Sequence, residues 1–199
     1  MFYQLNPRGR PPYAQPATKG RPMHYGRILT LVGVALAGVG FLLQSASSAA
    51  ADLMPALNEA TGGQIPDGFD NTWTALYNDT AWAAVVFGIA MAAAVIVALI
   101  PPLPQPMTRL YGLTAAVLGV LMLVIGVFAV MGAMDDADTL AAAFNQLFQA
   151  EQIPQAFSVD IGFGWYLLPI AGVVVAIGGV VSLINRPDED ALSGDSATA

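Results

Sequence analysis

The chain has 199 residues, of which 56% are hydrophobic and only 11% are charged, and it contains no cysteine. A soluble domain usually carries about 25% charged residues, so this composition is typical of a membrane protein. The net charge of −7 argues against a nucleic-acid partner, and without cysteine no disulfide can order an extramembranous loop.

Residues 1–26 are predicted to form a cytoplasmic arm. This stretch holds five prolines among scattered basic residues, which is typical of a flexible or polyproline-like segment. We favour a solvated tail that helps to set the topology. The alternative is an arm that lies on a neighbouring subunit or on anionic lipid headgroups.

Four apolar runs are long enough to cross a bilayer, whose core takes about 20 apolar residues in helical form. Because hydrocarbon offers the backbone no hydrogen bonds, each run should be a helix. We therefore predict an all-α integral membrane four-helix bundle within residues 27–184, followed by an acidic cytoplasmic tail at 185–199. The predicted spans are about 28–47, 81–103, 110–134 and 161–184, and the predicted outer loops are about 48–80 and 135–160.

The basic residues predict the orientation. All seven lie before the first span, between the second and third, or after the fourth. By the positive-inside rule both termini are cytoplasmic and the protein is a multi-pass protein of the cell (plasma) membrane. A competing reading is a secretory signal, because the small-residue stretch SASSAAAD at 45–52 resembles a cleavage site. We favour retention as a span, since the basic leader is long and the run can cross the membrane completely.

A short motif occurs twice, as QIPDGF at 64–69 and as QIPQAF at 152–157. Each copy lies in an outer loop and precedes a span that begins with an aromatic residue, Trp82 or Trp165. This matched position predicts a bundle of two similar hairpins, related by an axis along the membrane normal.

Both outer loops are predicted to contain a short amphipathic helix. In the second loop the helix begins at an N-cap formed by Asp138 and Thr139; in the first loop it lies within 53–60. The apolar stripe of the second helix has helical spacing and would cap the bundle or dock an extracytoplasmic partner. We favour the cap, and both roles can hold at once. The predicted cap or partner surface comprises Leu140, Phe144, Leu147 and Phe148, with Phe69 and Phe157 from the repeated motif.

Small residues in the spans predict close helix packing. Gly112, Gly119 and Gly126 recur every seven residues, which keeps one narrow seam facing a neighbouring helix. Because lipid tails are as apolar as leucine, packing at such seams is the main source of association for spans this poor in polar groups. The other predicted packing residues are Gly33, Ala37, Gly40, Ala84, Gly88, Ala92, Gly172 and Gly179.

The spans carry no charged side chain, whereas ion or proton transport through a bilayer needs such groups. No catalytic or cofactor motif is present, so we expect neither an enzyme nor a cofactor protein. Asp135, Asp136 and Asp138 could hold a divalent cation, although a solvated helix start is the commoner role for such a run. The glycosylation-like tripeptide at 78–80 is read as the N-cap of the second span.

The four-pass topology resembles that of claudins and tetraspanins, but the cysteines of those families are absent. The bias towards Ala, Gly, Val and Asp, with six Arg against one Lys, resembles proteins of high-G+C Gram-positive bacteria. In size and in its lack of redox ligands the chain is similar to small accessory subunits of the actinobacterial cytochrome bc1-aa3 respiratory supercomplex.

This resemblance implies a non-catalytic accessory or scaffold subunit that packs against lipids and other integral membrane subunits. The alternative function is a small transporter, channel or envelope sensor whose acidic outer loops collect a ligand. That function would need a polar path between the spans, which the sequence does not supply.

Overall fold

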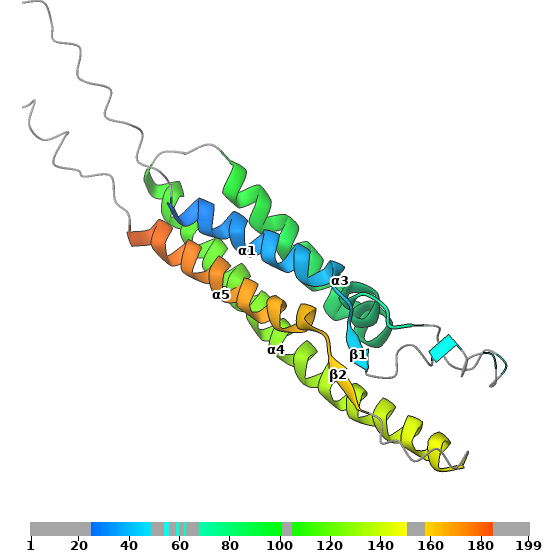
Figure 1. Cartoon of the computed structure of the whole chain (residues 1–199). Coiled ribbons are helices and arrows are strands. Elements are labelled where there is room, and N and C mark those ends of the chain that lie inside the picture. Colours follow the sequence, from blue (N-terminus) through cyan, green and yellow to red (C-terminus); the bar gives the residue numbers. More distant parts are fainter. Residues whose placement is uncertain are drawn as a thin grey trace, which may run out of the picture.

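The computed structural model describes residues 25–48, 54–55, 59, 62, 68–100, 105–150 and 158–184. Four helices lie lengthwise beside one another (Figure 1), and all four are long and apolar enough to cross a membrane. The chain is therefore a helical multi-pass membrane protein. The helices are α1 (Tyr25–Leu42), α3 (Thr72–Leu99), α4 (Gln105–Ala150) and α5 (Phe163–Ile184), and the strands are β1 (Ala46–Ser48) and β2 (Val159–Ile161).

The predicted arm up to residue 24, the acidic tail and the predicted first-loop helix lie outside the described residues, apart from isolated positions in that loop. The same holds for residues 64–67 of the first QIPxxF copy and for the whole of the second copy. The described residues are mostly helical, as predicted, and they add two short strands that were not predicted. The strands pair antiparallel, with Ser47 opposite Asp160, at the end of the bundle where α1 ends and α3 and α5 begin. We call this the sheet end.

Two of the predicted spans are too long at one end. Helix α1 stops at Leu42 because the chain turns there toward β1, five residues before the predicted limit at 47. Helix α3 stops at Leu99, and Ile100 is already extended with φ −60° and ψ 133°. A proline disfavours helical geometry in the residue before it, so Pro101 ends this helix before the predicted limit at 103.

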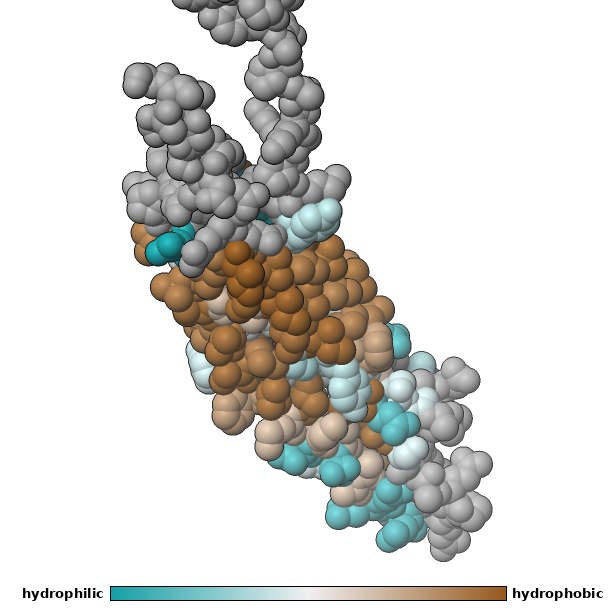
Figure 2. Space-filling model, turned by 90° about the vertical axis from the view of Figure 1, so that its left-hand side faces the viewer, coloured by the Kyte–Doolittle hydropathy of each residue, from teal (hydrophilic) through white to brown (hydrophobic). Residues whose placement is uncertain are grey.

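The surface of the bundle matches a membrane environment. Figure 2 shows a hydrophobic surface over the middle of the molecule, with hydrophilic residues toward the ends. Trp82 and Phe163 near the sheet end and Tyr25 near the opposite end are 68%, 65% and 59% exposed, as expected for aromatic residues at the membrane interfaces. Other exposed apolar residues include Ile28, Val39, Ile89, Ile96, Val117, Phe128, Ile177 and Ile184.

Helix α5 lies at the centre of the helix contacts, because it packs extensively against both α4 and α1. Along α4 the contact is made by glycines seven residues apart. A Cβ atom added to Gly119 would lie 2.6 Å from the Cα of Ala176, and one added to Gly172 would lie 2.7 Å from the Cα of Leu123. The two backbones therefore touch, and neither glycine position has room for a side chain.

Helix α1 meets α5 along a second seam of the same kind. Gly26, Gly33 and Gly40 are again seven residues apart, and a Cβ atom added to Gly33 would lie 2.9 Å from the carbonyl oxygen of Ala171. On the α5 side, a Cβ atom added to Gly178 would lie 2.6 Å from the carbonyl oxygen of Gly26. One helix thus presents two adjacent small-residue faces to two neighbours.

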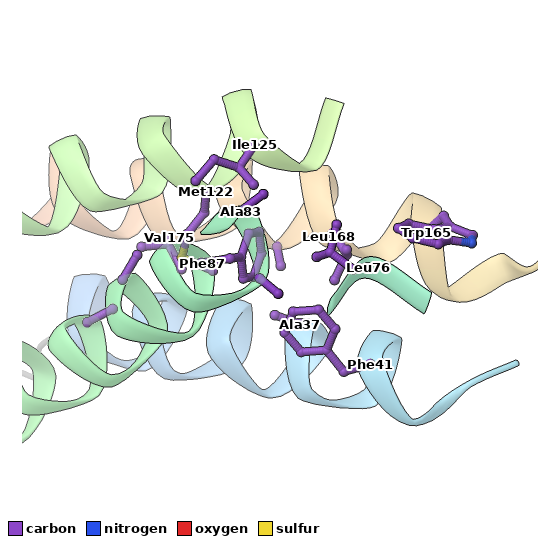
Figure 3. Packing of buried hydrophobic residues seen from close by; sticks show 14 of the residues in the cluster. Ala37, Phe41, Leu76, Ala83, Phe87, Met122, Ile125, Trp165, Leu168 and Val175 are labelled. Carbon is purple, nitrogen blue, oxygen red and sulfur yellow. The ribbon is translucent and has the colours of Figure 1, made fainter. Parts of the chain in front are cut away.

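Helix α3 completes the bundle through side chains instead. Phe87 is fully buried and points into the core between the other helices (Figure 3), where it meets Met122 and Val175. Its ring lies edge-on to Phe41, with centroids 5.3 Å apart. Helix α1 contacts α5 much more extensively than it contacts α3. The contact between the first two spans, which were predicted to pair as a hairpin, is therefore the smaller of the two.

Helix α3 is bent at Thr80, the one residue inside it with non-helical backbone angles (φ −138°, ψ 73°). The N-cap of α3 as a whole is Asn71, whose side-chain oxygen accepts a hydrogen bond from the Thr74 N–H at 2.8 Å. Two helical segments thus meet at Thr80, and the second, 81–99, begins where the cap at 78–80 was predicted. The tripeptide lies at the bend, directly before this apolar segment.

Helix α4 runs without a break from Gln105 to Ala150, so the predicted N-cap at Asp138 and Thr139 is wrong. Within the helix, the Thr139 hydroxyl donates a hydrogen bond to the carbonyl oxygen of Asp135 at 2.9 Å. No Gly or Pro occurs in 134–150 to stop the helix. The segment 135–150, which we call the α4 extension, continues about 24 Å beyond the apolar part of the helix.

The close contact of α4 with α5 leads to a prediction about stability. Gly119→Ala should lower the free energy of unfolding by about 1–3 kcal/mol, because the new methyl group would force the backbones of α4 and α5 apart. The measurement is thermal or denaturant unfolding in detergent.

The matched control for Gly119→Ala is Gly38→Ala in α1, because a Cβ atom at Gly38 has no atom within 4 Å. This control should leave stability unchanged or raise it slightly, since alanine favours a helix more than glycine does. Equal effects of the two substitutions would contradict the close packing of α4 on α5.

Candidate interaction site at the sheet end

Three chain segments meet at the sheet end and hold one another by backbone hydrogen bonds. The Ser45 N–H donates to the carbonyl oxygen of Asp70 at 2.8 Å, and the Thr72 N–H donates to the carbonyl oxygen of Leu43 at 2.8 Å. The Thr72 hydroxyl donates to the same Leu43 oxygen at 3.1 Å. The end of α1 is thereby tied to the start of α3.

The carbonyl oxygen of Ser45 ties the start of α5 into the same place. It accepts a hydrogen bond from the Gly162 N–H at 2.8 Å and another from the indole N–H of Trp165 at 2.7 Å. Trp165, the aromatic residue at the start of the fourth span, is buried with 5% of its surface exposed. We call residues 43–45, 70–72 and 162–165 the outer junction.

The two-stranded sheet extends from the outer junction and covers the α4 extension. Ala46 of β1 and Val159 of β2 form one buried cluster with Ala137 and Phe144 of α4. Met54 from the first outer loop belongs to this cluster, and Phe69, Ala141 and Ile161 pack against it. The apolar side of the extension is therefore covered by the chain itself, and we call this cluster the outer cap.

The outer cap places the predicted surface residues in different positions. Phe144 is buried and Phe69 packs beside it, but Leu140 is 42% exposed. The buried stripe runs through 137, 141 and 144 because the extension keeps the helical phase of α4, in which Ala133 is also buried. Leu140 therefore lies outside the covered stripe, and of its two predicted roles, cap or partner surface, only the second fits this exposure. The side chains of Leu147 and Phe148, and the whole of Phe157, lie outside the described part of the chain.

The predicted packing residues fall into two groups. Most of them lie in a helix contact: Gly33 and Gly40 on the α1–α5 seam, Gly112, Gly119, Gly126, Gly172 and Gly179 on the α4–α5 seam, and Ala37 and Ala84 in the core. In α3, however, Gly88 is half-buried and Ala92 is exposed. A Cβ atom at Gly88 would meet, at 3.4 Å, only the ring of Trp73 from the same helix. The predicted seam on this helix is therefore wrong beyond Ala84.

The acidic residues of the sheet end lie partly together. The bend in α3 brings Asp79 to α4, since a Cβ atom at Gly132 would be 3.8 Å from the Asp79 carboxylate. Partial loss of solvent raises the pKa of the Asp136 carboxyl above its ordinary value, and the negative charges of Asp79 and Asp135 raise it further. No cation-binding set of three His, Cys, Asp or Glu residues exists in the described part of the chain, and the predicted cluster that includes Asp138 forms none.

Charge is divided between the two ends of the bundle. The basic residues that the structure describes are Arg27 and Arg109, and both lie at the end opposite the sheet. The Arg27 guanidinium lies over the ring of Tyr111, 5.9 Å from its centroid, which links α1 to α4 by a cation–π contact. At the sheet end Asp70, Asp79, Asp135, Asp136, Asp138 and Asp160 are exposed.

Sequence reasoning missed several packing residues and the contacts of the outer junction. Gly26, Gly164 and Gly178 carry the α1–α5 seam, and their seven-residue spacing to Gly33 and Ala171 was a usable signal. The strand signal was weaker, because the alternating Val159-Asp160-Ile161 is only three residues long. Nothing local indicates that Ser45 receives the Trp165 indole N–H from 120 residues away.

Comparison of the chain with protein-family models, with curated proteins and with solved structures gives no match in any of the three. The function is therefore argued from the described geometry.

The acidic group gives a pH-dependent prediction. Asp136→Asn should raise the melting temperature slightly at neutral pH, because it removes a carboxylate that the fold disfavours in its charged form. Because the pKa of Asp136 is raised in the folded protein, its carboxyl is neutral in both the folded and the unfolded state below the ordinary pKa of 3.8. The gain in melting temperature should therefore vanish below that pH. Thermal unfolding in detergent at both pH values measures this.

Asp138→Asn is the control for the Asp136 substitution, since Asp138 is exposed on the same helix. It should leave the melting temperature almost unchanged at both pH values. A benefit of Asp136→Asn that persists at acidic pH would contradict the electrostatic explanation.

Proposed function

We propose that this protein is a non-catalytic accessory or scaffold subunit of a larger membrane assembly, in which its spans pack against other integral membrane subunits and lipids. The observation that carries the proposal is the α4 extension. A continuous 46-residue helix is about 69 Å long, more than twice the thickness of a bilayer core. It holds the outer cap as a rigid platform beyond the hydrophobic surface.

The polar groups of the bundle support a structural role. Among the described residues, the buried polar ones are Thr30, Ser45 and Thr72. The Thr30 hydroxyl donates to the Gly26 carbonyl oxygen at 3.0 Å within its own helix, and the other two residues are bonded to the backbone at the outer junction. These hydrogen bonds are made to backbone groups, within α1 and at the outer junction, which fits a structural role.

The charge division supports an orientation. With Arg27 and Arg109 at one end and the acidic residues at the other, the positive-inside rule places the sheet end outside the cell membrane and both termini in the cytoplasm. In this orientation the outer cap faces an extracytoplasmic partner. The respiratory assembly of an actinobacterium, suggested by the resemblance in composition, is the context we propose for it.

The exposed residue Leu140 is our candidate for the partner contact on the platform. It is 42% exposed on the α4 extension, beside the acidic residues, and the outer cap does not cover it. An exposed apolar side chain on a rigid helix gives a partner apolar surface to bury. A transporter, channel or sensor remains the alternative function, and proteoliposome flux above that of empty vesicles would favour it.

Purification in mild detergent tests the proposal. The wild-type protein should co-purify with at least one integral membrane protein in a fixed stoichiometric ratio, identified by mass spectrometry. Leu140→Glu should reduce the recovered partner at least about tenfold, as expected for loss of a contact worth more than about 1.4 kcal/mol. The fold should survive, because the residue is already exposed.

The control substitution is Ala142→Glu, which adds the same charge at an exposed position on another side of the same helix. It should leave the partner bound. A monomeric protein with no stoichiometric partner, under conditions that preserve other membrane complexes, would contradict the proposed function. Equal loss with both variants would show that charge at the platform, rather than Leu140, governs the contact.

A further inference from the structure

Helices α1, α4 and α5 hold one another in a way that resists relative movement. Along both seams a Cβ atom at the glycines would meet the backbone of the facing helix within 3 Å, as at Gly33 and Gly126. Such contacts involve backbone atoms, which have no alternative rotamers. Sliding or separating these helices would break many contacts at once, so the three behave as one rigid unit.

Helix α3 is attached to this unit by contacts of another kind. After its bend, the buried residues are alanines and one large side chain, Phe87. Its glycine, Gly88, meets only Trp73 of α3 itself, and α3 barely contacts the central helix α5. Of these buried residues only Phe87 has alternative rotamers, since alanine has none, so a change in the packing of this one ring would permit a small shear movement of α3.

The bend divides α3 into a part that is anchored at the outer junction and the segment 81–99. The start of the helix is fixed by the hydrogen bonds of Thr72 to Leu43. Thr80 then interrupts the helix with φ −138° and ψ 73°, angles outside the helical range. Interrupted positions that can absorb changes in φ and ψ are where hinges form.

From these observations we propose that the segment 81–99 of α3 pivots about Thr80 against the rigid unit of α1, α4 and α5. The aromatic rings that connect the two parts act as the latch. Phe41 of α1 lies edge-on to Trp73 before the bend, at 4.9 Å, and to Phe87 after it, at 5.3 Å. The pivot changes the face that the protein presents inside the membrane without unfolding either part. It follows from the packing alone and does not depend on the proposed function.

Paired spin labels test the pivot directly, because the chain has no cysteine and every label site can be introduced alone. The test pair is Ile96→Cys in α3 with Ile177→Cys in α5, and the control pair is Val32→Cys in α1 with Val117→Cys in α4. All four residues are exposed. In lipid nanodiscs the distance distribution of the test pair should be about twice as broad as that of the control pair. Equal widths would overturn the pivot.

A substitution at Phe87 distinguishes movement of α3 alone from loosening of the whole bundle. Phe87→Ala should broaden the test pair further and leave the control pair unchanged, because it frees only α3. Leu168→Ala removes another fully buried side chain, from the rigid unit, and serves as the matched control. Broadening of both pairs in Phe87→Ala, or the same broadening of the test pair in Leu168→Ala, would show that the bundle loosens as a whole and would overturn the pivot.

Discussion

The structure depends on the direct contact of the α5 backbone with the backbones of α4 and α1. In a hydrocarbon environment no hydrophobic force draws helices together, so van der Waals contact must supply the association. Glycines seven residues apart allow that contact on two adjacent faces of one helix. Once α5 is held on both sides, the strand before it, β2, lies beside the strand that follows α1. The small sheet and its Ser45 hydrogen bonds form where these two chain ends meet.

Hydropathy and residue spacing predict the membrane-spanning helices and the glycines of the α4 face, because both depend on residues close together in the sequence. The outer elements depend on distant residues. The pairing of Ser48 with Val159 and the burial of Trp165 beside Ser45 join the two outer loops, and no local pattern shows this. The N-cap expected at Asp138 fails for a different reason. An acidic residue with Thr is a good helix start, but nothing ends the preceding helix, so the pair lies inside it.

The N-cap expected at Asp138 also affects which residues of the outer helix are expected to be covered. Treated as a separate helix, the second loop has its most apolar stripe through Leu140. As a continuation of α4, it inherits a stripe through Ala133 and Ala137, which the outer cap covers. Leu140 then becomes an exposed residue on a rigid platform, shortly after Asp136 and Asp138 in the helix. Its exposure, together with polar groups bonded to the backbone, is the basis on which we propose a role in assembly rather than in transport or catalysis.

In the orientation that we propose, the four helices cross a membrane with the sheet end outside. Single cysteines introduced at Asp138, Val120 and Arg109 test it most directly, by labelling with a membrane-impermeant maleimide in intact cells. The account predicts labelling of the Asp138 position in intact cells, of the Arg109 position only after permeabilisation, and of the Val120 position in neither state. Labelling of the Arg109 position in intact cells would contradict it.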